Sequence, residues 1–214
     1  QSIAAAKAGN EVYHAAFLGH DGEMLKKAMK DNGVNVEMIK NHNETSGHAI
    51  IQVDENGQNC ILLYGGTNQC LTKEFIDDVL NSFGSEGIVL LQNETNCVDY
   101  IIERAYEKGL QVALNAAPMN DKVLSYPINK LSWLIVNEVE GKQIAGCDRD
   151  EDIIDVLREK YPECKILLTL GSNGACCYSD GELHSIGCYK VDVADTTAAG
   201  DTFTGYFLYG VLNG

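Results

Sequence analysis

Helix-type and strand-type patterns alternate along most of this chain, and several of the strand-type patterns are unbroken apolar runs. The runs at 87–91 and 165–170 are apolar at nearly every position. Such strands are typical of a parallel sheet that is buried on both faces, and helical patterns such as 97–108 separate them along the chain. The alternation predicts an α/β fold, a three-layer αβα sandwich with a mainly parallel central sheet.

The stretch 34–64 interrupts this alternation. It holds three short β-type runs, at 34–39, 48–53 and 59–63, and has no helical pattern of its own. The sequence Asp54-Glu55-Asn56-Gly57 between the last two runs is typical of a hairpin turn. We therefore predict a small antiparallel β segment here. No low-complexity linker or repeat divides the chain, so a single domain over 1–214 is expected.

The charge balance restricts the partners. Asp and Glu outnumber Lys and Arg by 31 to 16, a net charge of −15. Nucleic acids and anionic membranes need a basic face, so we expect neither as a partner. A small anionic ligand stays possible, because it needs only local donors. The chain has no apolar run of membrane-spanning length and no signal-peptide pattern at its start. Its eight Cys lack zinc or C-x-x-C spacing, so we expect reduced thiols in a cytoplasmic protein.

The densest chemical pattern lies at 194–205, where small residues lead into an apolar helix. Unpaired amides at such a helix start form an anion site that suits a phosphate. Asp201 stands in the first turn of this helix. A carboxylate beside a bound phosphate can accept the proton of an attacking hydroxyl. The alternative from the residues alone is that Asp201 only caps the helix, and the two interpretations are about equally supported.

Asp195-Thr196-Thr197-Ala198-Ala199-Gly200-Asp201 resembles the D-T-x-x-A/G-G-D signature of the ribokinase (PfkB-type) carbohydrate kinase family. Looser similarity appears at Gln1-Ser2-Ile3-Ala4-Ala5-Ala6, which continues the family's N-terminal G-G-K-G-A-N-Q, and at Phe17-Leu18-Gly19-His20-Asp21-Gly22. Gly65-Gly66-Thr67-Asn68 is also similar. Set against that family, the chain is expected to lack the family's beginning and end, so residues 1–214 alone are expected to be weakly active or inactive.

The resemblance implies roles for the C-terminal signature. Asp201 is expected to be the catalytic base. The backbone of the three residues before it is expected to form the anion hole that stabilises the transferring phosphoryl group: Ala198, Ala199 and Gly200. Asp195 and Thr197 match positions whose oxygens hold a monovalent cation, usually K⁺.

The resemblance also implies roles at three other strand ends. Asn137 and Glu140 match an N-x-x-E motif that positions Mg²⁺, through water, near the ATP phosphates. Residues of the T-L-G-x-x-G sequence are expected to bind the nucleotide: Thr169, Gly171 and Gly174. Glu94 matches an acidic residue that contacts the sugar. From the residues alone, Asn137 and Glu140 are more simply interpreted as a solvated helix start, the glycines as a turn, and Glu94 as a solvated charge.

The activity that the resemblance implies is ATP-dependent phosphorylation of a sugar hydroxyl, with D-ribose, giving ribose 5-phosphate, as the expected substrate. Alternatives left open are another sugar or nucleoside (fructose, deoxyribose or adenosine) and a non-catalytic sugar- or nucleotide-binding regulator. ATP, Mg²⁺ and K⁺ are the expected cofactors. In this family the strands corresponding to 34–64 form a lid over the sugar and a homodimer contact. The residues alone leave open a merely structural β flap.

Overall fold

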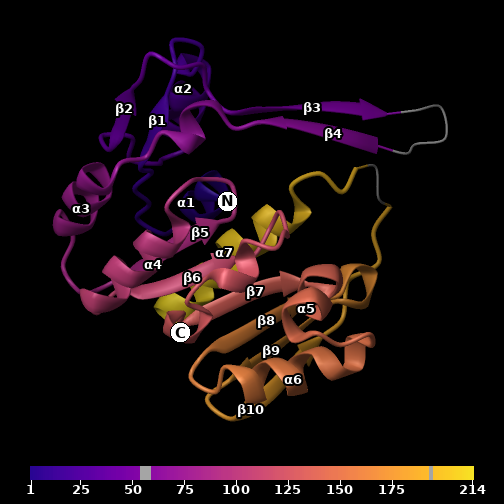
Figure 1. Ribbon diagram of the computed structural model, residues 1–214. Coiled ribbons are helices and arrows are strands. Elements are labelled where there is room, and N and C mark those ends of the chain that lie inside the picture. Colours follow the sequence, from indigo (N-terminus) through magenta and orange to yellow (C-terminus); the bar gives the residue numbers. More distant parts are fainter. Residues whose placement is uncertain (54–58, 193–194) are drawn as a thin grey trace. The chain divides into compact units, whose positions relative to one another are not determined.

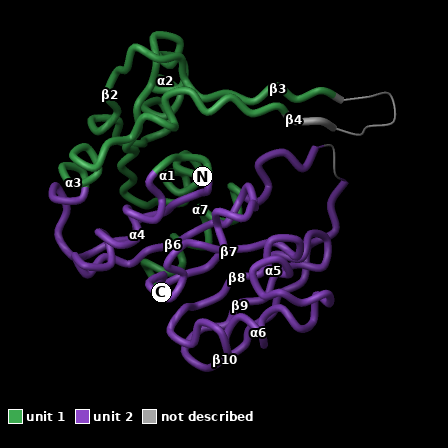
Figure 2. Tube along the Cα trace, viewed as in Figure 1, with its two compact units in different colours: residues 1–79, 94–96, 201–214 green, residues 80–93, 97–200 purple. Residues whose placement is uncertain are grey.

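The computed structural model describes residues 1–53, 59–192 and 195–214. Their contacts divide the chain into two compact units (Figure 2). The first unit comprises residues 1–79, 94–96 and 201–214, and the second comprises 80–93 and 97–200. A single domain over 1–214 stays a prediction.

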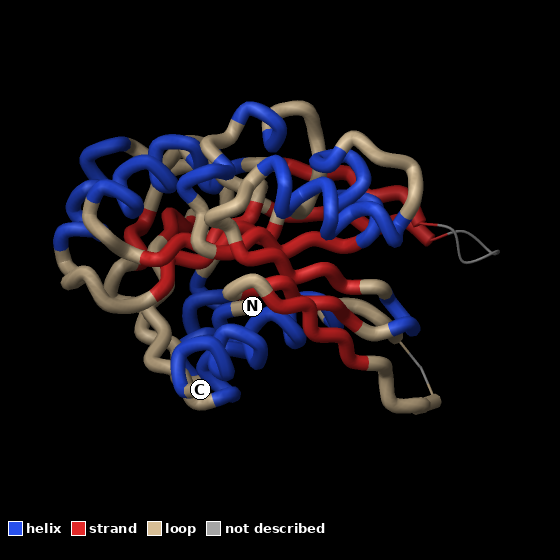
Figure 3. The backbone as a smooth tube through the Cα atoms, turned by 90° about the horizontal axis from the view of Figure 1, so that it is seen from below, coloured by secondary structure: helices blue, strands red, loops and turns tan. Residues whose placement is uncertain are grey.

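The second unit is built on a six-stranded sheet in the order β10-β9-β8-β7-β6-β5 (Figure 1). Figure 3 shows strands in red and helices in blue. The first four strands of the sheet along the chain, β5 to β8, are parallel, and β9 runs antiparallel to both of its neighbours. This confirms the predicted α/β fold with a mainly parallel sheet. The strands are β5 (Ile88–Gln92), β6 (Gln111–Asn115), β7 (Trp133–Asn137), β8 (Lys165–Thr169), β9 (Ala175–Ser179) and β10 (Glu182–Ile186).

Three helices pack on this sheet: α4 (Val98–Glu107), α5 (Glu138–Ala145) and α6 (Ile153–Lys160). The parallel strands are added in one direction, so right-handed crossovers bring these helices to one face. Side chains of β6, β7 and β8 form the core with the helices, and the largest fully buried ones include Leu114, Leu134, Ile166, Ile102, Ile144 and Leu157. The expectation that the strand at 87–91 is fully buried is wrong. β5 is half-buried throughout, because it lies at the edge of the sheet.

The first unit contains two small sheets. β1 (Ala16–Leu18) pairs in parallel with β2 (Ile39–Asn41), and β3 (His48–Val53) pairs antiparallel with β4 (Asn59–Tyr64). Its helices are α1 (Ser2–Ala8), α2 (Glu23–Asp31), most of α3 (Lys73–Asn81) and most of α7 (Ala199–Asn213). No helix of the described segments is both long enough and apolar enough to cross a bilayer.

The predicted antiparallel β segment at 34–64 needs correction in its first run, whereas its role as a lid stays a prediction. Residues 34–38 form no strand, and β2 joins β1 rather than the antiparallel pair, so within 34–64 only β3 and β4 form the antiparallel ribbon. The physical reason is a single parallel bridge between Tyr13 and Asn35, which pairs this segment with the preceding chain instead. The turn predicted at Asp54-Glu55-Asn56-Gly57 lies outside the described residues.

The small residues of α1 allow a close approach to α7 within the first unit. A Cβ added at Gly205 of α7 would stand 2.5 Å from the backbone nitrogen of Ala5 and 2.7 Å from the Cβ of Ala4. Gly205 is itself buried. The two helix backbones are therefore in contact, and a residue with a side chain at 205 would force them apart.

Candidate active site

Two carboxylates of the first unit lie within electrostatic reach of each other. Glu94 follows β5, and Asp201 stands in the first turn of α7. Partial burial, and then the negative charge of Asp201, raise the pKa of Glu94. Asp201 is half-buried and Glu94 is exposed, so both can meet a ligand. The structure thus brings together the residue expected to contact the sugar and the residue expected to act as base.

The start of α7 has open space above its backbone. A Cβ added at Gly200 would meet no atom within 4 Å, and residues 198–200 are exposed. Ala198 has a φ of 61°, in the left-handed region that residues with a side chain rarely adopt. The amide of Ala199 donates to the carbonyl of Thr196 at 3.1 Å, so one of the predicted anion-hole amides already has a partner in the turn. The geometry suits an anion that approaches from the Gly200 side.

Asp195 and Thr197 are held together just before this helix. Oδ1 of Asp195 accepts hydrogen bonds from the Thr197 amide at 2.8 Å and from the Thr197 hydroxyl at 2.7 Å. These bonds, the amide's first, lower the pKa of Asp195. Both side chains are exposed. The structure brings the two residues together, but within the described segments no group of three or more His, Cys, Asp or Glu could hold a metal ion. The cation role stays a prediction.

Asn137 and Glu140 form a capping box at the start of α5. The Asn137 side-chain oxygen accepts from the amides of Val139 and Glu140, both at 2.9 Å. Glu140 in turn accepts from the backbone amide and the side-chain Nδ2 of Asn137, both at 3.0 Å. Glu140 is only 7% exposed, and this burial raises its pKa against the opposing effect of the Asn137 bonds. A solvated helix start is therefore the wrong interpretation for Glu140.

The predicted nucleotide loop begins beside Asn137. Thr169 ends β8 and is the register partner of Asn137, the last residue of β7. Gly171 follows with a φ of 52°. Gly174 has a φ of 97°, and a Cβ there would stand 1.9 Å from the carbonyl oxygen of Ile186. The identity of Gly174 thus has a structural explanation of its own, and its contact with a nucleotide stays a prediction.

One organising residue was missed at the sequence level. Asn93 directly precedes Glu94 and is buried. Its Nδ2 donates to the carbonyl of Pro118 at 2.7 Å, and its Oδ1 accepts from the hydroxyl of Tyr126 at 2.6 Å. Asn93 therefore fixes the backbone just ahead of Glu94. The available sign was a short polar residue directly after an apolar strand.

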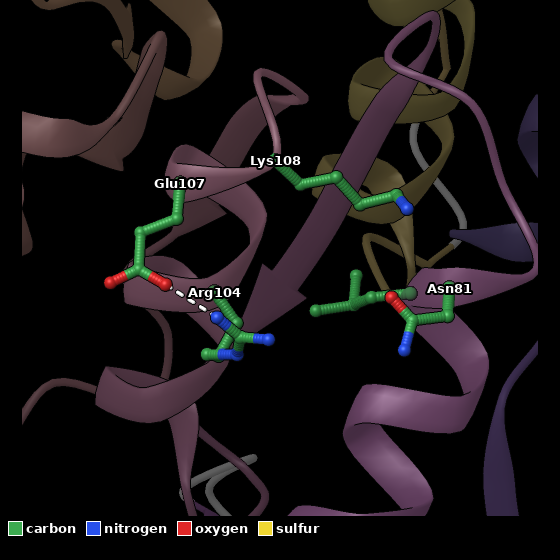
Figure 4. A pocket seen from close by; sticks show the side chains of 5 residues that line it. Asn81, Arg104, Glu107 and Lys108 are labelled. Atoms are coloured by element: carbon green, nitrogen blue, oxygen red, sulfur yellow. Dashed lines mark hydrogen bonds and ion pairs between the residues drawn. The ribbon is translucent and has the colours of Figure 1, made fainter.

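The cavity shown in Figure 4 lies elsewhere in the second unit. Its volume is about 230 Å³, and it is lined by Leu80, Asn81, Arg104, Glu107 and Lys108. Arg104 and Glu107 form an ion pair at 2.5 Å there. These residues lie at the ends of α3 and α4, ahead of β5 and β6 in the chain. They therefore lie toward the amino ends of the parallel strands, whereas ligands of such sheets bind outside the carboxyl ends.

Residues 1–214, the whole chain, match the pfkB family carbohydrate kinases. The chain belongs to the PfkB family. It is 29% identical over 230 residues to a ribokinase of Arabidopsis thaliana, and the match covers 100% of this chain but 60% of that curated relative's length. This PfkB-family chain is also similar to solved structures of other proteins. A ribokinase of Cryptococcus neoformans in complex with ADP is 30% identical with a TM-score of 0.86, covering 99% of this chain and 73% of that one.

Ribokinase of Arabidopsis thaliana, complexed with ribose and ATP, is a second similar structure. It is 27% identical with a TM-score of 0.80, and the match covers 100% of this chain and 73% of that chain. The residues of this PfkB-family chain also fit the cofactors of a kinase. Open helix-start amides at Gly200 suit a phosphate, and the carboxylates of Glu138 and Glu140 beside the β7 end supply the hard oxygen atoms that Mg²⁺ prefers.

Proposed function

We propose that the protein is a kinase that uses ATP to phosphorylate a sugar hydroxyl, with the conversion of D-ribose to ribose 5-phosphate as the leading reaction. The observation that carries the proposal is the proximity of Glu94 to Asp201, whose negative charge, after partial burial, raises the pKa of Glu94. Asp201 is joined by one peptide bond to Gly200, which leaves open space for a phosphate. Membership of a carbohydrate kinase family supports this assignment.

The proposed chemistry is an in-line phosphoryl transfer. The sugar hydroxyl oxygen bonds to the terminal phosphorus of ATP while the bond from that phosphorus to the ADP oxygen breaks. Asp201 accepts the hydroxyl proton, a role typically worth about 10²–10⁴ in rate. Glu94 binds another hydroxyl of the sugar and so orients the acceptor. Amides at the start of α7, with Gly200 at their centre, stabilise the charge on the transferring group.

The remaining predicted residues are assigned to the nucleotide and the ions. Thr169, Gly171 and Gly174 bind the nucleotide, and the Asn137–Glu140 pair lies at its magnesium ion, which when bound neutralises phosphate charge. Asp195 and Thr197 hold K⁺ next to the anion hole.

The test is ADP release by the protein expressed from its complete reading frame, with ATP, Mg²⁺ and K⁺ present. D-ribose, fructose, 2-deoxyribose and adenosine are compared as acceptors, with Asp201→Asn as the control variant. Ribose-dependent ADP release that Asp201→Asn abolishes would support the proposal. Release with another acceptor alone would replace the substrate, and acceptor binding without any turnover would favour a non-catalytic regulator.

We also propose that the β3–β4 ribbon, residues 48–53 and 59–64, contacts a second copy of the chain. On one face the register aligns Ala49 with Leu63, and Ile51 lies on the same side. Ile51 is 57% exposed and Leu63 is 65% exposed. The opposite face is mixed, because the rings of His48 and Tyr64 lie there, tilted by 40° with centroids 5.1 Å apart. A two-stranded ribbon gains stability only when its apolar face is covered.

Sedimentation velocity tests this dimer with a matched pair of variants. Leu63→Asp puts a charge on the apolar face and is expected to give monomers. Leu62→Asp puts the same charge on the mixed face, where Leu62 is 54% exposed, and is expected to leave dimers. Monomers for the unaltered protein, or the same mass for both variants, would contradict the proposal.

A further inference from the structure

The carboxylate of Glu94 is placed by its main chain alone. Among the residues that the structure describes, this exposed side chain has no hydrogen bond to the protein. A residue that binds a hydroxyl of the sugar must nevertheless lie in a defined place, because a displacement of about 1 Å can cost about 100-fold in rate. The position of the carboxylate therefore depends on what holds the backbone of residues 94–96.

Two side-chain amides tie this backbone to the residues that follow β4. Nε2 of Gln69 donates to the carbonyl of Glu94 itself at 3.0 Å. Asn96 pairs with Leu71 in both directions: its Nδ2 donates to the Leu71 carbonyl at 2.8 Å, and its Oδ1 accepts from the Leu71 amide at 3.0 Å. The backbone amide of Asn96 also donates to the carbonyl of Asn68 at 3.1 Å. These hydrogen bonds join two segments that both belong to the first unit.

The turn that supplies Gln69 is itself fixed at the base of the β3–β4 ribbon. The amide of Thr67, a fully buried residue, donates to the carbonyl of Thr45 at 3.0 Å. Gly66 has a φ of 48°, and a Cβ there would stand 2.3 Å from the same carbonyl oxygen. The stem of Gln69 lies equally close to Gly65, where a Cβ would stand 2.6 Å from the Gln69 Cγ. Gln69 therefore extends from a turn that has little room to shift.

We infer that Gln69 and Asn96 are positioning residues for the sugar: they hold the backbone of 94–96 against the base of the ribbon, so that the carboxylate of Glu94 meets a hydroxyl of the acceptor. They set the affinity for the acceptor and leave the KM for ATP unchanged, because Glu94, through which they act, is assigned to the sugar. This inference rests on the proposed function, since it requires Glu94 to bind the sugar. If these bonds only stabilised the fold, their loss would not act through Glu94.

The test is titration calorimetry on the protein expressed from its complete reading frame, with D-ribose or whichever of the four acceptors supports ADP release. Gln69→Met keeps an unbranched side chain but removes the donor, and is expected to weaken acceptor binding about fivefold. The KM for ATP at saturating acceptor and the melting temperature are expected to stay unchanged, because Gln69 is exposed. Asn32→Leu is the matched control. The Asn32 side-chain amide also donates to a carbonyl, that of Ala28 at 2.8 Å, and its loss is expected to leave acceptor binding unchanged.

A double-mutant cycle with Glu94→Ala separates positioning from folding. Once Glu94→Ala has removed the carboxylate, Gln69→Met is expected to cause no further loss of acceptor affinity. Asn96→Leu removes two bonds, so it is expected to weaken acceptor binding more than Gln69→Met does and also to lower the melting temperature. If Asn96→Leu does not fold, the cycle with Gln69→Met decides alone.

The inference is overturned if Gln69→Met leaves the acceptor affinity unchanged, or if it weakens acceptor binding equally with and without the Glu94 carboxylate. A rise in the KM for ATP equal to the loss of acceptor affinity would also overturn it, because the effect would then not be confined to the sugar. Absence of binding and turnover of all four acceptors with the unaltered protein would instead contradict the proposed function.

Discussion

Gly200 and Gly210 lie on the same helix, and at both positions an added methyl group would meet no atom within 4 Å. Alanine is favoured over glycine in a helix, so neither Gly200→Ala nor Gly210→Ala is expected to lower the melting temperature. Gly200→Ala is expected to reduce turnover about 100-fold, since the methyl group keeps the phosphate from the backbone. Gly210→Ala is the matched control. Thermal melts and ADP release measure both, and equal activity of the two variants would contradict an anion site at Gly200.

Glu94 should give the protein a recognisable pH dependence. Burial and the charge of Asp201 raise its pKa from the ordinary value of 4.5, so the folded chain binds this proton more readily than the unfolded chain does. Stability therefore falls as the pH rises from about 4.5 through the raised pKa, and above it the loss is constant. Glu94→Gln removes the ionisable group. Its melting temperature is expected to exceed that of the unaltered protein by about 1 °C at pH 8, because the side chain is exposed.

Calorimetry between pH 4 and pH 8 checks this expectation for Glu94→Gln, and the difference in melting temperature should shrink toward pH 4. The variant is also expected to lose sugar-dependent turnover. If Glu94 is retained for function rather than for stability, the Glu94→Gln variant should be more stable and less active than the unaltered protein. A difference that is independent of pH would contradict the raised pKa of Glu94.

The local order of the site residues was predictable to different degrees. Asn137 and Thr169 could be placed, because each follows an apolar run, and parallel strands end at one edge. The pairing of Glu94 with Asp201 could not be derived from spacing, because it joins distant segments. The residues of the capping box are visible in the sequence as Asn137-Glu138-Val139-Glu140. The burial of Glu140 could not be predicted from the sequence, because it depends on how α5 packs.

At the level of helices, the contact between α1 and α7 depends on one missing side chain. Gly205→Ala would bring a Cβ to 2.5 Å from the Ala5 backbone nitrogen. Overpacking of this kind costs about 1–3 kcal/mol, so the melting temperature is expected to fall by several degrees. Gly210→Ala on the same helix is again the control. Thermal melts that show equal stability for the two variants would contradict the close packing.

The strands were predictable where the local pattern and the pairing agree. β9 and β10 form a hairpin with Asp-Gly between them, and Asp180 and Gly181 adopt the positive φ angles, 52° and 85°, of a tight turn. The prediction of a strand at 34–39 is wrong, because a β-type pattern does not indicate which neighbouring segment will pair with it. It meets Tyr13 at one bridge instead of forming a third antiparallel strand.

Over the entire chain, the net charge of −15 predicts an unusual response to salt. An acidic protein repels an anionic nucleotide at long range, and added ions screen this repulsion. Raising the ionic strength with tetramethylammonium chloride, at fixed K⁺ and Mg²⁺, is therefore expected to lower the KM for ATP about twofold. Steady-state kinetics measure the effect. A KM that rises with salt would mean that local cationic groups dominate nucleotide binding.

The fold class was predictable because it follows from repeated local patterns, an apolar strand and then a helix. The division of the chain into two compact units has no corresponding local pattern in the sequence. Residues 94–96 and 201–214 join the first unit although the chain around them belongs to the second. Assignments of that kind arise from contacts between distant segments, which periodicity does not record.

The backbone conformation of Ala198 has a consequence for how this position can change in evolution. Its φ of 61° holds an alanine in a backbone state that glycine reaches without strain, at a cost of roughly 1 kcal/mol or more. A single nucleotide change in the codon would supply that glycine and relieve the strain. It would also widen the range of directions in which the following amides point. Ala198 thus holds the turn ahead of Asp201 in a strained backbone conformation with fewer accessible directions for the following amides. In a lineage selected for heat resistance alone, Ala198 should be the first residue of this turn to be replaced by glycine.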